Sequence, residues 1–211
     1  MTVLEIGAGA GNTAFPILAR NKNPQLKLHA CDFSKKAVEV MRAHEAYNTD
    51  LMQADVWDVA GDELPPNLGE GSVDLALMVF IFSALSPLQW KKAVENVYRV
   101  LKPGGEVCFR DYGRGDLAQV RFKKGRYLEE NFYIRGDGTR VYFFEKDELA
   151  DIWSGKAAES AESSEGEEPA GERVRPRFDV EDLGVDRRLL VNRAKKLKMY
   201  RCWLQGRFRK Q

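Results

Sequence analysis

An apolar run followed by three glycines lies at the start of the chain: Thr2-Val3-Leu4-Glu5-Ile6-Gly7-Ala8-Gly9-Ala10-Gly11-Asn12. We expect a strand that turns through the glycines into a helix over residues 12–20, because glycine permits a tight turn and a close backbone approach to a ligand. A dinucleotide-binding loop would carry a glycine where Asn12 stands. The loop by itself therefore leaves two interpretations, a site for a different ligand or a tight turn that binds nothing.

The composition is that of a soluble globular protein. The chain has 211 residues, 44% hydrophobic and 31% charged, which suffices for one domain with a full core. Its longest apolar stretch, residues 75–85, is too short to span a bilayer, and no signal-peptide pattern is present. The three cysteines are too widely spaced for a disulfide framework or a metal knuckle. We therefore expect a single-domain cytoplasmic protein over residues 1–211, with no membrane association and no metal site.

The near-neutral charge conceals an uneven distribution. The formal net charge is +1, but residues 155–172 contain six Glu and one Lys, so the rest of the chain carries +6. Such a basic body suits a polyanionic partner. Residues 154–173 combine Ser, Glu, Ala and Gly with little apolar surface, and we expect them to form a disordered acidic insertion.

Strands and helices alternate along the first half of the chain. Residues 86–101 give the clearest helix signal, because Ser86 and Gln89 form a capping box around Pro87 and apolar residues recur behind it at helical spacing. A second helix is expected after Ser34, which is a plausible N-cap. Strands are expected at residues 26–31, 51–54, 73–82 and 106–110. This order predicts an α/β fold with a Rossmann-like, mostly parallel sheet.

The second half departs from this alternation. Residues 131–134 and 140–144 predict an inserted β-hairpin that turns at Gly136-Asp137-Gly138. A helix is expected over residues 146–153, ahead of the acidic tract. Residues 186–192 and 198–208 predict two further strands, paired antiparallel, which add an antiparallel C-terminal edge to the sheet.

Two aspartates are predicted to end successive strands beside the glycine loop. Asp32 could accept both ribose hydroxyls of a nucleoside cofactor, and Asp55 the adenine amino group, with a helix cap or turn aspartate as the alternative for each. The Gly-x-Gly-x-Gly loop with Glu5 two residues ahead resembles that of S-adenosylmethionine (SAM) methyltransferases. Ligands at three neighbouring strand ends favour SAM as the cofactor. The predicted cofactor-binding residues are Glu5, Gly7, Gly9, Asn12, Asp32, Phe33, Asp55, Val56 and Val79.

Several segments together resemble the methyltransferase-like family that forms 3-methylcytidine in tRNA. They are Gly11-Asn-Thr-Ala-Phe-Pro16, Ala30-Cys-Asp-Phe-Ser34, Phe80-Ile-Phe-Ser-Ala84, Arg110-Asp-Tyr-Gly-Arg-Gly-Asp116, Arg121-Phe-Lys-Lys124 and residues 131–144. The ending, Val185-Asp-Arg-Arg-Leu-Leu-Val-Asn-Arg193 and Met199-Tyr-Arg-Cys-Trp-Leu-Gln205, is most similar to the branch acting on threonine tRNA, which includes fungal actin-binding fusion proteins. The resemblance covers nearly the whole chain outside the acidic tract.

The resemblance implies a SAM-dependent class I methyltransferase that modifies N3 of cytidine 32 in the anticodon loop of threonine tRNAs, with serine tRNAs as a second class. It implies tRNA as the partner, with an aminoacyl-tRNA synthetase or an accessory subunit as a further one. Members of the family carry a segment ahead of the glycine loop, so we expect this chain to be a truncated form. The alternatives are a non-catalytic RNA-binding fragment with the methyltransferase fold, and a small-molecule or protein methyltransferase.

Two residues beyond the strand 106–110 are candidates for catalysis. Neutral cytosine already has a lone pair at N3, so the enzyme chiefly aligns it with the methyl donor. The Asp111 carboxylate could stabilise the positive charge that develops on the base, with an ion pair to Arg110 or Arg114 as its structural alternative. Tyr112 could stack on the flipped base, with a packed loop aromatic as the alternative.

Basic residues interleaved with aromatic ones suit contact with RNA phosphates and bases. A solvated charged face is the usual explanation for any single one of them. The predicted substrate-binding residues are Arg110, Arg114, Arg121, Lys123, Arg135, Arg140, Arg187, Arg188 and Arg193.

Overall fold

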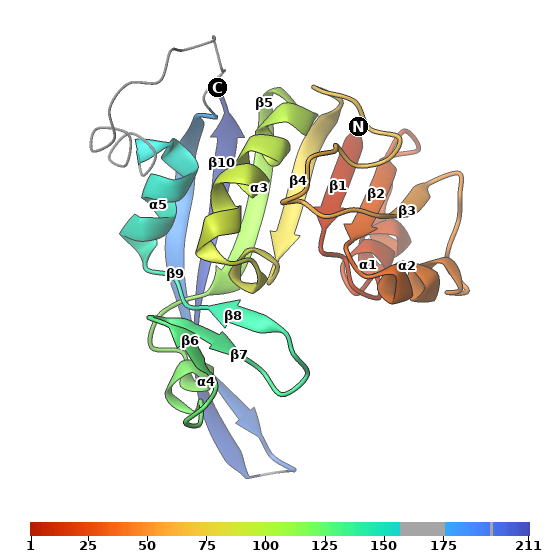
Figure 1. The fold of residues 1–211 in the computed structure, drawn as a ribbon. Coiled ribbons are helices and arrows are strands. Elements are labelled where there is room, and N and C mark those ends of the chain that lie inside the picture. Colours follow the sequence, from red (N-terminus) through yellow and green to blue (C-terminus); the bar gives the residue numbers. More distant parts are fainter. Residues whose placement is uncertain (157–175, 195) are drawn as a thin grey trace.

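The computed structural model describes residues 1–156, 176–194 and 196–211. Its main sheet has seven strands in the order β3-β2-β1-β4-β5-β10-β9 (Figure 1). The first five are parallel to one another, and β10 is antiparallel to both of its neighbours. The α/β fold class with an antiparallel C-terminal edge is therefore confirmed. The strands are β1 (Thr2–Ile6), β2 (Lys27–Asp32), β3 (Met52–Val56), β4 (Val73–Val79), β5 (Leu101–Tyr112), β9 (Phe178–Asn192) and β10 (Leu197–Lys210).

Helices cover both faces of this sheet. The helices α3 (Pro87–Val100) and α5 (Lys146–Ser154) pack on one face, and α1 (Ala14–Arg20) and α2 (Lys35–Arg42) on the other (Figure 1). Alternate residues of each strand enter different clusters, because successive side chains of a strand point to opposite faces. In β1, Leu4 joins the cluster under α3 and Val3 the cluster under α1 and α2.

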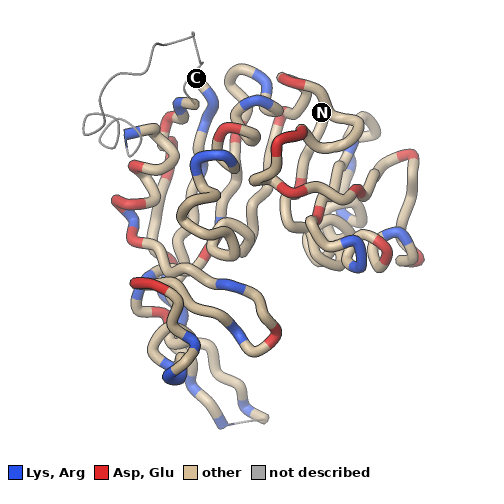
Figure 2. The backbone as a smooth tube through the Cα atoms, in the orientation of Figure 1, with Lys and Arg blue, Asp and Glu red and all other residues tan. Residues whose placement is uncertain are grey.

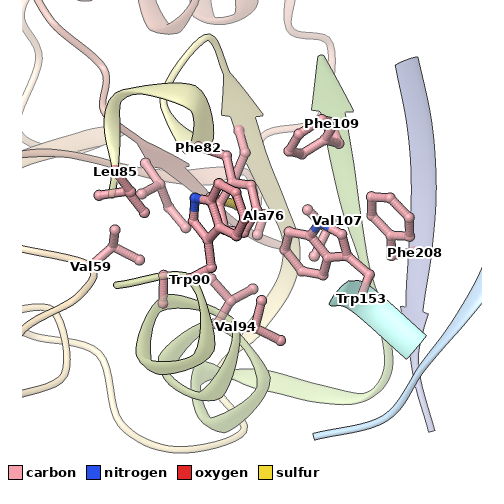
Figure 3. Close-up of a cluster of buried hydrophobic side chains, with 14 of the residues drawn as sticks. Val59, Ala76, Phe82, Leu85, Trp90, Val94, Val107, Phe109, Trp153 and Phe208 are labelled. Atoms are coloured by element: carbon pink, nitrogen blue, oxygen red, sulfur yellow. The ribbon is translucent and has the colours of Figure 1, made fainter. Parts of the chain in front are cut away.

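Aromatic rings dominate the core beneath α3 and α5. Phe82 packs between Trp90 of α3 and Trp153 of α5, with ring centroids 5.8 and 5.6 Å away (Figure 3). Trp153 in turn stacks on Phe208 of β10 at 4.7 Å with an interplanar angle of 5°. This cluster joins the C-terminal strand to the first half of the chain.

Both predicted helix caps are present. The Ser34 side chain accepts a hydrogen bond from the Ala37 N–H, and the Gln89 side chain accepts one from the Ser86 N–H at 3.0 Å. Two boundaries were wrong. The first helix begins at Ala14 rather than Asn12, and β4 ends at Val79 rather than Phe82. The backbone of Phe80 has a positive φ of 57°, which breaks the strand, and a 3-10 turn, η1 (Phe82–Ala84), follows.

The inserted element is larger than the predicted hairpin. It is a three-stranded sheet of β6 (Tyr127–Glu129), β7 (Phe132–Ile134) and β8 (Arg140–Tyr142), with a short helix α4 (Leu117–Val120) before it. The turn at Gly136-Asp137-Gly138 is confirmed, since the Arg135 N–H donates to the Thr139 carbonyl at 2.8 Å. The strand β6 was missed because its three residues are all exposed and show no alternation. The insert lies beyond the carboxyl ends of β4 and β5 (Figure 1).

The two C-terminal strands are longer than predicted. They pair with each other from Phe178 to Asn192, whereas β10 pairs with β5 only from Trp203 onward. Residues 187–192 and 197–201 thus extend past the sheet as a two-stranded ribbon (Figure 1). Of the predicted acidic insertion, residues 157–173 lie outside the described residues.

No helix in the described ranges is both long and apolar enough to cross a bilayer. Within the same ranges, no three His, Cys, Asp or Glu side chains are grouped so that they could hold a metal ion.

Replacing Trp153 with alanine should destabilise the fold by about 3–5 kcal/mol, because a fully buried ring stacked on Phe208 leaves a cavity that rigid neighbours cannot fill. Denaturant unfolding measures the change. The matched control is Leu88→Ala on α3, whose side chain is 94% exposed and should change stability by less than about 0.5 kcal/mol. A Trp153→Ala loss as small as that of the control would contradict the role given to this ring.

Candidate functional site

The glycine loop is held by a buried carboxylate. The two Asp32 oxygens accept hydrogen bonds from the Gly9 N–H at 2.8 Å and from the Ser34 N–H at 2.9 Å. Asp32 is only 8% exposed and ends β2, so it joins the loop after β1 to the start of α2. Both Gly7 and Gly9 have positive φ, of 71° and 57°, a conformation that other residues adopt at a cost. The predicted position of Asp32 at a strand end is confirmed.

The loop approaches the segment after β4 closely. A Cβ atom at Gly7 would lie 2.7 Å from the Ile81 side chain, so only glycine fits between them. Strand register brings the other predicted residues to the same edge, since Ile6 pairs with both Cys31 and Met78, and Asp32 pairs with Val56. The carboxyl ends of four parallel strands thus lie together at one edge of the sheet. We call this edge the crevice, after the place where open α/β sheets bind ligands.

The carboxyl group of Glu5 is buried beneath this crevice and has a raised pKa. Its side chain is 3% exposed, and burial raises the pKa of the carboxyl to about 7, although hydrogen bonds from Thr13 and Ala14 oppose the shift. The Oε2 atom has no hydrogen-bond partner within the described part of the chain. An acceptor held without a partner beside the loop is suited to a polar or cationic ligand group.

The remaining predicted cofactor-binding residues differ in their exposure to solvent and in whether they already have partners. Phe33 and Val56 are 74% and 41% exposed at the ends of β2 and β3, and Asn12 is exposed in the loop. Val79 is half-buried at the end of β4. Asp55 already has partners, because Arg42 donates to it at 2.9 Å and Asn67 at 3.4 Å.

Asp111 is fully buried, and its alternative role in an ion pair was wrong. Its oxygens accept hydrogen bonds from the Ser83 N–H at 2.9 Å and from the Tyr112 N–H at 2.8 Å. Burial raises the pKa of this carboxyl to about 6, against the lowering effect of those hydrogen bonds. The side chain joins the end of β5 to the turn η1 and has no surface of its own in the crevice.

The two arginines proposed as its partners bind elsewhere. Arg110 donates to Asp186 at 2.9 Å and to Gln205, and Arg114 pairs with Glu145 and Glu148 of the region around α5. Both pairings join segments distant in the sequence, which the local pattern around Asp111 could not indicate. Arg140 is also bound within the chain, since it donates to the Ala84 carbonyl at 3.0 Å and to Gln89.

Tyr112 stands in an aromatic and cationic group at the end of β5. Its ring lies 4.8 Å from Phe80, and the guanidinium groups of Arg135 and Arg201 lie 5.1 and 5.7 Å from its centroid. Phe80 also contacts Trp203 at 6.0 Å. Phe80 and Trp203 were not among the predicted site residues, because Phe80 was expected inside a strand and the last strand at the edge of the sheet.

Other predicted basic residues are exposed. Arg121 and Lys123 follow α4, and Arg187, Arg188 and Arg193 lie on the ribbon of β9 and β10. Figure 2 shows Lys and Arg positions along this projecting ribbon, and residues 187–205 contain no Asp or Glu. The structure therefore separates arginines that hold the fold together from a basic ribbon that is open to solvent.

Comparison with known proteins bears on what this crevice does. A family model described as a methyltransferase domain matches residues 4–107, which include the glycine loop and the four strand ends. The chain is 50% identical over 209 residues to the tRNA N(3)-methylcytidine methyltransferase of Schizosaccharomyces pombe, covering 99% of this chain and 61% of that protein. Residues 4–107 thus lie in a methyltransferase domain. The predicted resemblance to the tRNA 3-methylcytidine methyltransferases is confirmed.

A second relative and a solved structure are also similar to this chain. The tRNA(Thr) (cytosine(32)-N(3))-methyltransferase of Saccharomyces cerevisiae is 49% identical over 210 residues, 99% of this chain and 30% of that protein. This chain therefore spans about three fifths of the first relative and three tenths of the second. A SAM-dependent methyltransferase from Methanosarcina mazei has the same fold, with a TM-score of 0.65 at 17% identity over 99% of this chain and 92% of that one.

Folding stability should depend on pH through Asp111. The folded protein keeps a proton on this carboxyl up to about pH 6, whereas the unfolded chain loses it near 3.8. Stability is therefore greatest below pH 4 for this group and falls as the pH rises through 6, by about 3 kcal/mol.

The Asp111→Asn variant lacks this titration and serves as the reference. Denaturant unfolding of both proteins at pH 4.5, 5.5 and 7 should show wild type losing stability relative to the variant as pH rises. Because Glu5 titrates in both proteins, its contribution cancels in the difference. A difference that does not change with pH would contradict the buried state of Asp111.

Proposed function

We propose that this chain is the catalytic domain of a SAM-dependent tRNA (cytidine-N3) methyltransferase that forms 3-methylcytidine at position 32 of the anticodon loop of threonine tRNAs, with serine tRNAs as a second class. The observation that carries the proposal is the similarity of 49–50% over 99% of the chain to two relatives named for 3-methylcytidine formation. It extends through the basic ribbon as well as the cofactor crevice. The finer part of the proposal places the protein in the cytoplasm, with an aminoacyl-tRNA synthetase or an accessory subunit as a further partner.

The crevice supports SAM as the methyl donor. The Asp32 oxygens each accept one backbone N–H, and a carboxylate oxygen has a second lone pair free for a ribose hydroxyl. Phe33 and Val56 present apolar surface beside it for the adenine ring. Glu5 supplies an unsatisfied acceptor under the loop, which would gain a partner from the cationic part of SAM. Asp55 would exchange its contact with Arg42 or Asn67 for the adenine amino group.

Methylation at N3 requires the cytosine to be aligned with the methyl donor and does not require a base to remove a proton first. N3 of neutral cytosine attacks the methyl group with its own lone pair, and the positive charge passes from the sulfonium to the base. Asp111 acts here as a positioning residue, because it fixes the backbone of Ser83 and Tyr112 at the end of β5. Its negative charge, buried beneath Tyr112, would also stabilise the cationic base through the low-dielectric interior.

The ribbon supports RNA as the substrate. Its exposed residues include Arg187, Arg188, Arg193, Lys196 and Lys198, and residues 187–205 contain no Asp or Glu. Of these five, Arg188 pairs with Asp186 at 2.9 Å. Such a surface gains affinity for a phosphate backbone by releasing counterions. Arg121 and Lys123, between α4 and β6, are exposed as well.

Methyl transfer from labelled SAM should label unmodified threonine tRNA in the presence of this chain, and nucleoside mass spectrometry should identify the product as 3-methylcytidine at position 32.

Asp32→Ala should weaken SAM binding, measured by calorimetry, by about tenfold to a hundredfold, because it removes a charge-assisted acceptor and releases the glycine loop. Asp62→Ala is the control, since the Asp62 side chain is 97% exposed and contacts Lys92 of α3 rather than the glycine loop. In the methyl-transfer experiment, label that enters protein or metabolites while the tRNA stays unlabelled would refute the proposed function.

Reversing charge on the ribbon should weaken RNA binding. Arg187→Glu combined with Arg193→Glu should lower affinity for tRNA at 100 mM salt and should reduce the slope of log Kd against log salt by about one to two, because two phosphate contacts are lost. Fluorescence anisotropy over a salt series measures both quantities. The control is Arg20→Glu on the exposed end of α1, which should leave the slope unchanged. Equal effects of the two changes would assign binding to overall charge rather than to the ribbon.

A further inference from the structure

Three aromatic rings meet three guanidinium groups where β4, β5 and β10 come together. Phe80 lies 4.8 Å from Tyr112 and 6.0 Å from Trp203. Arg110 and Arg201 lie over the Trp203 ring at 4.5 and 5.1 Å, and Arg135 and Arg201 lie over Tyr112 at 5.1 and 5.7 Å. We call Phe80, Tyr112 and Trp203 the aromatic platform. It adjoins the crevice directly, because Phe80 follows Val79 at the end of β4.

The platform lies on the face of the sheet opposite to α3 and α5. In β5, Phe109 and Asp111 point into the core beneath those helices, so Arg110 and Tyr112 point the other way. Register places Trp203 of β10 directly beside Tyr112 and Gln205 beside Arg110. The platform is therefore built from neighbouring strands rather than from a loop, which fixes the relative positions of Tyr112 and Trp203.

Phe80 is held in a strained conformation that exposes its ring. Its φ of 57° is rare for a bulky side chain, and its ring is 37% exposed beside a core of fully buried aromatic residues. The backbone of Phe80 is still joined to the sheet, because its N–H donates a hydrogen bond to the Arg110 carbonyl of β5 at 2.8 Å. Strain that the surroundings impose on a single residue is concentrated at functional sites.

The guanidinium groups are also fixed in place. Asp116 is fully buried, and its carboxylate accepts hydrogen bonds from Arg201 Nε at 2.8 Å and from the Cys202 N–H at 2.9 Å. Arg110 is held by Asp186. The arginines thus keep their guanidinium groups over the rings, where their positive charge suits the phosphates that flank a bound base.

We propose that the aromatic platform is the subsite that receives the extruded target nucleobase, with the flat base stacked on Phe80 and the flanking phosphates beside Arg135 and Arg201. The Trp203 ring, at 65° to that of Phe80, would lie against the edge of the base. The proposal rests on the proposed function, which supplies RNA as the substrate. A base in a folded tRNA loop must be turned out of its stack before its N3 edge can reach a methyl donor, and this requires a surface that replaces the lost stacking. Phe80 and Trp203 thereby become determinants of substrate binding.

The test compares two RNA probes by fluorescence anisotropy, using the 211-residue chain with S-adenosylhomocysteine. One probe is an anticodon stem-loop of threonine tRNA with cytidine at position 32, and the other carries an abasic ribose there. Wild type should bind the cytidine probe roughly tenfold more tightly, because one stacked base is lost from the other. Phe80→Leu and Trp203→Leu should each bring the two affinities close together and leave binding of the abasic probe unchanged.

Tyr98→Leu is the matched control. Tyr98 of α3 also combines a ring with a cation, since Lys210 lies 4.3 Å from its centroid, but Lys210 is at the opposite end of β10 from Trp203. This variant should keep the wild-type ratio of the two affinities. The unchanged binding of the abasic probe shows that the platform variants are folded. A wild-type ratio near one, or a ratio that survives both platform substitutions, would overturn the proposal.

Failure of this inference can be distinguished from failure of the proposed function. If both platform variants methylate cytidine 32 at the wild-type rate with the wild-type affinity ratio, the function holds and the platform is refuted. If the platform variants lose the ratio but wild type forms no 3-methylcytidine, the base-binding subsite stands and the reaction assigned to it is refuted.

Discussion

Buried carboxylates that accept backbone N–H groups fix the loops on which this structure depends. Asp32 binds the N–H groups of Gly9 and Ser34, and Asp111 those of Ser83 and Tyr112. Loop N–H groups at the carboxyl ends of parallel strands have no partner within the sheet, and leaving them unpaired in the interior would cost about 1–3 kcal/mol each. An ionised acceptor satisfies two of them at once and holds two loops in register.

The same arrangement recurs at the junction between the insert and the last strand. Asp116 binds the Ala118 and Cys202 N–H groups together with Arg201, and so joins α4 to β10 across 86 residues of sequence. Each of the three aspartates is less than a tenth exposed. Their charges stay inside the protein because hydrogen bonds replace the lost water. The crevice, the aromatic platform and the ribbon are consequently placed by three similar local interactions.

The role of a charged residue could be predicted where it depends on neighbouring residues in the sequence, and not where its partners are far away in the sequence. Asp32 lies at the predicted strand end, because strand–helix alternation and the glycine loop are local features of the sequence. The alternative ion pair of Asp111 was wrong, since Arg110 instead meets Asp186, and Arg114 meets Glu145. These partners lie 31–76 residues away, and no spacing rule in the sequence connects them. Asp55 was identified as a strand-end acid, but its contact with Arg42 could not be foreseen from its position alone.

The sequence by itself determined the α/β class, the glycine loop, the acids at the strand ends and the resemblance to the tRNA 3-methylcytidine methyltransferases, because each depends on residues near one another or on a recognisable order of segments. Tertiary structure alone decided which arginines are open to solvent and which are bound within the fold. It also decided that β4 stops at Val79 and that Phe80 adopts a positive φ. The apolar run there continues in sequence to Phe82, whereas in the structure the chain turns out of the sheet at Phe80, and the Ser83 N–H then donates to Asp111. Such long-range contacts form when strands pair, which is why they leave no pattern in the sequence itself.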